Sequence, residues 1–296
     1  MNKNSKPKIS IGIPVYNGDK YLSLLLNTLL EQSYANFEII ISNNDSSDLT
    51  NKICLDYASR DDRIHYILQD KPIKAYDNYK VVLDNSNGKY FMWIAADDLL
   101  GDKNYLKHLN DNISDKYDYY ITEVSIIDSE GLTIRSNIMQ GFKDCITQFD
   151  FINESLLINS HQVYGLFLIN KLKDDFKYLN ECKNLSCYNE GLFVHAISAK
   201  RKGKFLPNAE KLYRRHENNW SSRVKATKLF VSFIMYSTKS IKYLISLKSF
   251  STLEKIRLIR RKFSTDLPYI AYLALASIWQ TFGLKKISFL KKLLGR

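Results

Sequence analysis

Residues 9–30 read ISIGIPVYNGDKYLSLLLNTLL, and this stretch decides how the first part of the chain folds. Isoleucines at alternate positions, Ile9, Ile11 and Ile13, predict a β-strand with one buried face. The polar run from Asn17 to Asp19 predicts a turn, and the leucines that follow at helical spacing predict a helix. The opening stretch is therefore a strand, a turn and a helix.

The same order recurs along the first hundred residues. Apolar runs predict strands over 37–41, 63–68 and 90–96, and helical patterns over 49–59 and 74–86 lie between them. Strands that alternate with helices predict an α/β fold with a mostly parallel sheet and helices on both faces. Ligands of such sheets bind beyond the carboxyl ends of the strands, where the strand order reverses.

Beyond residue 101 the alternation becomes irregular. We predict helices over 102–113, 147–157 and 188–202, and strands over 117–127 and 132–138. From residue 221 onwards the pattern is helical, with Lys and Arg on one side and apolar residues on the other. We therefore expect a first domain over 1–220, with a nucleotide-binding half at about 8–100 and an acceptor-side half at about 101–220, followed by a basic amphipathic tail over 221–296.

Composition and charge exclude several classes of protein. A chain of 296 residues with 45% hydrophobic and 25% charged residues is neither wholly disordered nor a polytopic membrane protein. The four cysteines form no CxxC pair, which excludes a zinc ribbon and a disulfide scaffold. The polar residues 1–8 lack the apolar core of a secretory signal, so we expect a cytoplasmic protein.

The net charge of +12 is concentrated in the tail, where residues 220–296 carry 16 basic residues against Glu254 and Asp266. We therefore expect the near-neutral body to carry the catalytic activity and the cationic tail to contact an anionic surface. Nucleic acid is disfavoured, because no nucleic-acid-reading motif accompanies the charge.

Two adjacent carboxylates, Asp97 and Asp98, directly follow the apolar run that ends at Ala96. Their repulsion at the tip of a buried strand is offset by a divalent cation that bridges them to a ligand phosphate. The alternative is that the pair caps the next helix. Residues 13–17 and 43–48 end two other strands with an aromatic ring, amides and carboxylates, which are the parts of a nucleotide site.

In this order the motifs resemble the family 2 glycosyltransferases of the GT-A fold, of the bacterial surface-polysaccharide type. The resemblance runs to about residue 220 and rests on IPVYN (13–17), FEII (37–40), NNDSSD (43–48), GKY (88–90), Asp97-Asp98 and YRRH (213–216). It implies an inverting, metal-dependent enzyme that moves a sugar from a nucleotide-diphospho-sugar, with a UDP-sugar expected, to a hydroxyl of a lipid-linked or growing surface saccharide.

The resemblance also implies a role for each matching position. The nucleotide-sugar would contact Asp97 and the residues that follow the first strands, namely Pro14, Tyr16, Asn17, Asn44, Asp45 and Asn78. Asn44 stands where the family usually has an acidic residue that meets the base, which leaves the base preference open.

Catalysis in this family needs a metal and a general base. Asp98 would be the direct ligand of Mg²⁺ or Mn²⁺, with His216 as a second ligand. We expect Asp98→Asn to abolish metal-dependent turnover and to leave the fold intact. Glu190, at the start of a helix, would take the proton of the acceptor hydroxyl. The alternative bases are Asp174, Asp175 and Glu181.

Several interpretations of the tail remain open. Residues 267–284 are uncharged, but they include polar residues and are flanked by basic ones. This composition favours peripheral attachment to the anionic inner face of the cytoplasmic membrane. The alternatives are packing on the body or on a second protomer, and a membrane span. A homo-oligomer stays open. The alternative functions are a polyprenyl-phosphate sugar synthase, a sugar-1-phosphate nucleotidyltransferase, and a catalytically silent nucleotide-binding scaffold at the membrane.

Overall fold

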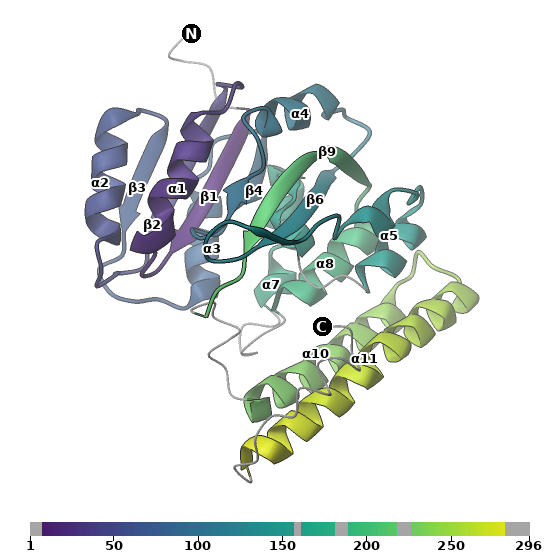
Figure 1. Cartoon of the computed structure of the whole chain (residues 1–296). Coiled ribbons are helices and arrows are strands. Elements are labelled where there is room, and N and C mark those ends of the chain that lie inside the picture. Colours follow the sequence, from purple (N-terminus) through teal and green to yellow (C-terminus); the bar gives the residue numbers. More distant parts are fainter. Residues whose placement is uncertain (1–7, 157–160, 181–188, 218–225, 282–296) are drawn as a thin grey trace. The chain divides into compact units, whose positions relative to one another are not determined.

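The computed structural model describes residues 8–156, 161–180, 189–217 and 226–281 (Figure 1). The chain divides into two compact units that are interleaved in sequence. The first comprises Met1–Cys145, His161–Phe176 and Arg201–His216, and the second comprises Ile146–Ser160, Lys177–Lys200 and Glu217–Arg296. This division differs from the expected boundary at residue 220, because parts of the expected first domain pack with the tail helices.

The first unit is built on a mixed sheet with the strand order β3-β2-β1-β4-β8-β6-β9-β5, and β7 pairs with β6. The first four strands are all parallel, as predicted, and β1 lies between β2 and β4. β8 then runs antiparallel to both β4 and β6, whereas β9 runs parallel to β6 and β5 runs antiparallel to β9, so the second half of the sheet is mixed. The strands are β1 (Ile9–Val15), β2 (Phe37–Asn43), β3 (Ile64–Leu68), β4 (Tyr90–Trp93), β5 (Leu99–Leu100), β6 (Tyr119–Ile127), β7 (Thr133–Arg135), β8 (Leu166–Leu168) and β9 (Gly203–Arg214).

Helices lie on both faces of this sheet. The isoleucines of β1 pack on one face with the buried leucines of α1. Gly12 points the other way, where an added Cβ would lie 2.7 Å from Val82 of α3 and 2.6 Å from the Phe91 ring. The absence of a side chain at Gly12 therefore lets α3 approach the sheet closely. The helices of this unit are α1 (Asp19–Leu30), α2 (Thr50–Arg60), α3 (Ala75–Asp84), α4 (Tyr105–Asn112) and α6 (Ile169–Asp175), with 3₁₀ turns at Gln140–Phe142 and His161–Tyr164.

Strand β9 was not predicted from the sequence. Its burial is irregular along its twelve residues, and its pairing with β6 shifts register between Thr122 and Glu123, so the strand carries no clean alternation. It nevertheless lies between β6 and β5 in the interior of the sheet. This strand brings Lys211 and Arg214 into the first unit.

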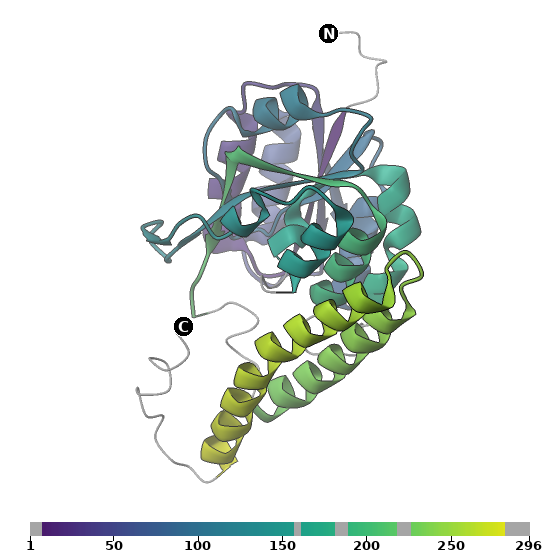
Figure 2. The same cartoon turned by 90° about the vertical axis from the view of Figure 1, so that its right-hand side faces the viewer.

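The second unit is helical and contains α5 (Gln148–Ser155), α7 (Lys177–Asn180), α8 (Asn189–Lys200), α10 (Ala226–Ser246) and α11 (Thr252–Thr281). Figures 1 and 2 show α10 and α11 side by side as an antiparallel pair. One apolar cluster joins α5, α8, α10 and α11 through Ile152, Ala199, Leu244 and Leu258. The tail helices thus supply half of this core. Among the helices that the structure describes, none is both long enough and apolar enough to cross a membrane.

A buried ion pair within α11 contacts two residues of α10. Lys262 Nζ lies 2.9 Å from Asp266 Oδ1, and both side chains are almost fully buried. The Ser237 hydroxyl of α10 donates to the other Asp266 oxygen, and the Tyr236 ring centroid lies 4.2 Å from Lys262 Nζ. These contacts satisfy both charges away from water, which fixes the register of the two helices.

Candidate functional site

The carboxyl ends of β1, β2 and β4 meet at the point where the strand order reverses. Chain connections leave β1 towards β2 and β3 on one side, and return to β4 on the other side. Open sheets of this kind bind ligands outside such a switch point. The residues that the sequence singles out after these strands therefore share one edge of the first unit.

The turns after β1 and β2 are tied together by hydrogen bonds. The Asn17 backbone N–H donates to Ser46 Oγ at 2.9 Å, and Asn17 Oδ1 accepts from the Ser47 N–H at 2.9 Å. Asn17 and Asp45 have φ of 51° and 56°, a left-handed conformation that Asn and Asp tolerate better than other side chains. Asn17 therefore supports the turn, and its contact with a nucleotide stays a prediction.

Asp98 lies at the centre of the site and is fully buried. Its Oδ2 accepts from Lys211 Nζ at 3.0 Å, and its Oδ1 accepts from the Arg214 backbone N–H at 3.0 Å. Burial raises the pKa of the Asp98 carboxyl, and the Lys211 ammonium acts against that rise. Both carboxylate oxygens are therefore used within the protein.

Asp97 is oriented differently. Its side chain is 27% exposed, and its Oδ2 lies 2.9 Å from Nε2 of His216. The His216 ring packs 5.0 Å from the Tyr21 ring, and Arg214 Nε donates to the Asp97 carbonyl at 3.0 Å. In this structure Asp97, and not Asp98, presents a partly exposed carboxylate beside His216, and the roles expected of the two residues stay predictions.

Sequence reasoning missed Lys211 and named Arg214 only as part of the YRRH stretch. Both come from β9, and the Lys211 ammonium also lies 3.6 Å from the Tyr164 ring centroid. Arg214 additionally donates to the carbonyls of Asp128 and Ser129, each at 3.0 Å. The only sequence signal was the YRRH stretch itself, which gave no reason to place Lys211 beside a carboxylate.

Two amides expected at the nucleotide are engaged within the protein. The Asn44 side chain donates to the Ile73 carbonyl at 2.9 Å and accepts from the Ile73 N–H at 2.8 Å. Asn78 is buried, and its side chain accepts from the Ser42 hydroxyl at 2.6 Å and donates to the Ser42 carbonyl at 3.0 Å. Both amides hold the end of β2 and the loop before α3, so their contact with a nucleotide stays a prediction.

Other expected contacts lie on the surface of this edge. Tyr16 is 57% exposed, Asp45 is exposed, and Pro14 is half-buried. An exposed aromatic ring next to exposed polar side chains is suited to stacking on a base. These three positions therefore remain available to a ligand.

Glu190 belongs to the second unit and lies in the first turn of α8. Burial raises the pKa of the Glu190 carboxyl, although a backbone hydrogen bond acts in the opposite direction. A carboxylate with a raised pKa takes a proton more readily than an ordinary one. Of the alternative bases, Asp174 is exposed, Asp175 is buried 2.7 Å from Arg201 Nε, and Glu181 lies outside the described residues.

Over the part of the chain that the structure describes, no three His, Cys, Asp or Glu side chains gather closely enough to hold a metal by themselves. The first unit offers two adjacent donors, the Asp97 carboxylate and the His216 imidazole. A metal at this edge would therefore complete its coordination with oxygens from a ligand or from water.

Comparison with solved structures reveals relatives of this fold. Residues 1–349 of the S. aureus protein TarS, solved in complex with UDP-GlcNAc, superimpose with a TM-score of 0.67 at 18% identity, over 87% of this chain and 73% of that chain. The mannosyltransferase PcManGT from Pyrobaculum calidifontis, solved with GDP-Man and Mn²⁺, gives a TM-score of 0.59 at 12% identity, over 99% of this chain and 79% of that chain. The first of these likenesses identifies the fold as GT-A, as the sequence predicted.

Comparison with curated sequences also identifies glycosyltransferases. Glycosyltransferase GlyA of Streptococcus pneumoniae is 34% identical over 103 residues, which is 34% of this chain and 14% of GlyA. The minor teichoic acid biosynthesis protein GgaB of Bacillus subtilis is 24% identical over 233 residues, 77% of this chain and 25% of GgaB. The chain thus spans less than a third of these relatives. The family model "Glycosyl transferase family 2" matches residues 10–173, more than half of the chain, and the protein therefore belongs to this family.

Proposed function

We propose that the protein transfers a sugar, with inversion, from a nucleotide-diphospho-sugar to a hydroxyl of a saccharide acceptor. The observation that carries the proposal is the Asp97–His216 pair at the switch point of the sheet, beside the exposed Tyr16 and Asp45. The nucleotide-sugars bound by TarS and PcManGT support this donor class. We propose UDP as the nucleotide.

A divalent cation fits the residues present. The partly exposed Asp97 carboxylate and the His216 Nε2 would hold Mg²⁺ or Mn²⁺ together with the donor diphosphate, and the cation would neutralise charge on the leaving group. The Mn²⁺ bound by PcManGT supports the same view. Asp98 would act beneath this pair as a positioning residue, because it holds the Arg214 backbone and the Lys211 ammonium.

Inverting transfer also requires a base for the acceptor hydroxyl, and we propose Glu190. Its raised pKa and its place in the first turn of α8 support this role. Glu190→Gln should abolish transfer and leave donor binding unchanged. Equal loss of donor binding in this variant would remove Glu190 from the role of base.

For the acceptor we propose a lipid-linked or growing surface saccharide, which the name of the teichoic acid biosynthesis protein GgaB supports. The basic tail supports peripheral attachment to an anionic membrane surface. This attachment cannot be tested by deleting residues 221–296, because Leu244 and Leu258 share a core with Ile152 of α5. Replacement of exposed basic residues is the suitable perturbation, with vesicle binding as the measurement.

Calorimetric titration of the full chain with UDP, GDP, CMP and dTDP, each with and without Mn²⁺, tests the donor site. We expect one diphosphate to bind about tenfold more tightly with Mn²⁺. Asp97→Asn and His216→Gln should each remove the Mn²⁺ effect.

Asp84→Asn is the matched control, because this exposed carboxylate pairs with Lys80 at the other end of α3. It should leave the Mn²⁺ effect intact. Binding of no nucleotide would contradict the donor site, and Mn²⁺-independent binding would contradict the metal site.

A further inference from the structure

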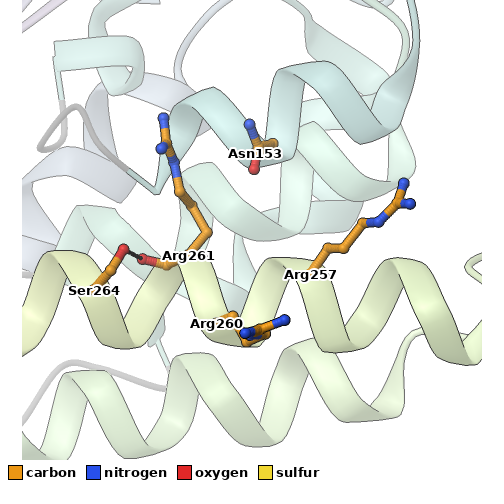
Figure 3. A pocket seen from close by; sticks show the side chains of 5 residues that line it. All are labelled: Asn153, Arg257, Arg260, Arg261 and Ser264. Atoms are coloured by element: carbon orange, nitrogen blue, oxygen red, sulfur yellow. Dashed lines mark hydrogen bonds between the residues drawn. The ribbon is translucent and has the colours of Figure 1, made fainter.

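The second unit contains an open pocket between α5 and α11 with a volume of about 510 Å³. Figure 3 shows its five lining side chains, with Arg257 and Arg261 extending from α11 towards α5, which contributes Asn153. Ser264 lies one turn further along α11 and donates its hydroxyl to the Arg261 carbonyl at 2.8 Å. Three of the five lining residues are arginines, with Arg260 as the third.

Within the described ranges, none of the three guanidinium groups forms an ion pair. The acidic side chains of α11 itself are used elsewhere: Glu254 accepts from the Ser251 backbone N–H at 2.8 Å, and Asp266 pairs with Lys262. Hydrogen bonds from Ser251, and then the charge of Arg257, lower the pKa of the Glu254 carboxyl, so the pocket gathers three guanidinium groups of which one has a carboxylate nearby.

One donor in the pocket is both buried and unsatisfied. Nε of Arg261 is shielded from solvent and has no hydrogen-bond partner in the described structure. A buried N–H without an acceptor is costly, and native proteins retain few of them. A shift of the Arg261 side chain towards an anion in the pocket would expose Nε and supply the missing acceptor.

The geometry of the donors favours phosphate. Guanidinium groups present parallel N–H donors that match the spacing of phosphate oxygens, and charge-assisted bonds of this kind are the strong ones. Asn153 adds an amide that can donate an N–H from α5. We propose that the second unit binds a phosphate group, as a monoester or diester, between α5 and α11.

The surface beside the pocket indicates the source of this phosphate. Four exposed apolar residues, spaced along one face of α11, are 46–59% exposed: Leu253, Ile256, Phe263 and Leu267. Arg260 lies on the same face, between Ile256 and Phe263. A phosphate site next to an apolar stripe matches a membrane lipid, whose headgroup phosphate adjoins its acyl chains. A soluble phosphate-bearing saccharide is the other source.

Two variants with equal loss of charge separate this site from general electrostatic attraction. The pocket variant combines Arg257→Gln with Arg261→Gln, and the control combines Lys242→Gln with Lys248→Gln, two exposed lysines outside the pocket. The probes are glycerol 3-phosphate in solution, and phosphatidylcholine vesicles with and without phosphatidylglycerol, all without Mn²⁺. Circular dichroism melting verifies that each variant is folded.

We expect the pocket variant to bind glycerol 3-phosphate and phosphatidylglycerol vesicles about tenfold more weakly, and the control to change less than about twofold. Arg261→Lys keeps the charge and removes Nε, so its loss of binding should lie between the losses of the pocket variant and the control. Equal losses of binding in the pocket and control variants would overturn the proposal. Such a result would mean attraction by charge alone, because each basic residue near an anionic surface contributes similarly.

The remaining outcomes are also decisive. Loss with glycerol 3-phosphate but not with vesicles would support the phosphate site and overturn the lipid as its source. Binding of neither probe by the wild-type chain would overturn the site. The proposal does not depend on the donor site, and UDP titration of the pocket variant should match the wild type.

Discussion

Replacing Asp98 by Asn should destabilise the protein by about 3 kcal/mol, in addition to any effect on turnover. The carboxylate is fully buried and accepts from Lys211 Nζ and the Arg214 N–H, each at 3.0 Å. An Asn side chain has one acceptor oxygen, so one of these two donors loses its partner whichever way the amide lies. Breaking a buried pair costs about 3–5 kcal/mol, and we expect the lower end because the Tyr164 ring still faces the ammonium.

A double-mutant cycle with Lys211→Met measures the pair directly. Lys211→Met alone leaves a buried carboxyl without its counter-charge, whereas the double variant removes both members. We therefore expect the double variant to lose less stability than the sum of the single variants, with a coupling free energy of about 2 kcal/mol. Urea unfolding at pH 7, followed by circular dichroism, provides the free energies.

Asp97→Asn is the neighbouring control. Its carboxylate is partly exposed, so its loss should change the free energy of unfolding by less than about 1 kcal/mol. If Asp98→Asn left stability within about 0.5 kcal/mol of the wild type and the cycle were additive, the ion pair would not form in solution. Asp98 would then be free to bind a metal, as the sequence had led us to expect.

Burial and the nearby Lys262 hold the pKa of His195 well below 6.5 in the folded protein. As the pH falls, His195 therefore binds a proton in the unfolded chain before it does so in the folded protein. The free energy of unfolding should accordingly decrease as the pH drops below about 6.5. His195→Gln should reduce this slope by up to about 1.4 kcal/mol per pH unit, measured by urea unfolding at several pH values. Gly165→Ala should cost about 1–3 kcal/mol in the same assay, because its Cβ would lie 2.6 Å from the Tyr120 carbonyl oxygen; an unchanged midpoint would mean that the backbone yields there. Asn44→Asp would place a second acceptor against the Ile73 carbonyl and should cost about 1–3 kcal/mol, and a neutral result would show that the Asn44–Ile73 bonds contribute little.

The first half of the fold follows from local sequence. The alternating isoleucines of β1 and the spaced leucines of α1 each bury one face, and that periodicity is visible without any tertiary contact. The pattern also predicted β6 and α8 within a few residues. It failed at β9, because a strand that carries Lys211 and Arg214 into the sheet is stabilised by partners that are distant in the chain.

The different burial of Asp97 and Asp98 shows the same limit within the site. Two adjacent carboxylates after an apolar run are equivalent in sequence, and only the position of Lys211, 113 residues later, selects Asp98 for burial. Asn44 is a similar case. Its amide matches a nucleobase edge as well as it matches the Ile73 backbone, and the loop before α3 decides between them.

The late position of β9 in the chain has a consequence for how the protein is made. During synthesis, β1 to β4 leave the ribosome before β9, so Asp98 first meets its partners only after residue 214 has emerged. Until then its carboxylate must stay hydrated, which keeps that end of the nascent sheet open to water. Contacts of such large sequence separation form slowly, and the edge that carries Asp97 and His216 is therefore expected to be among the last parts of the first unit to become ordered.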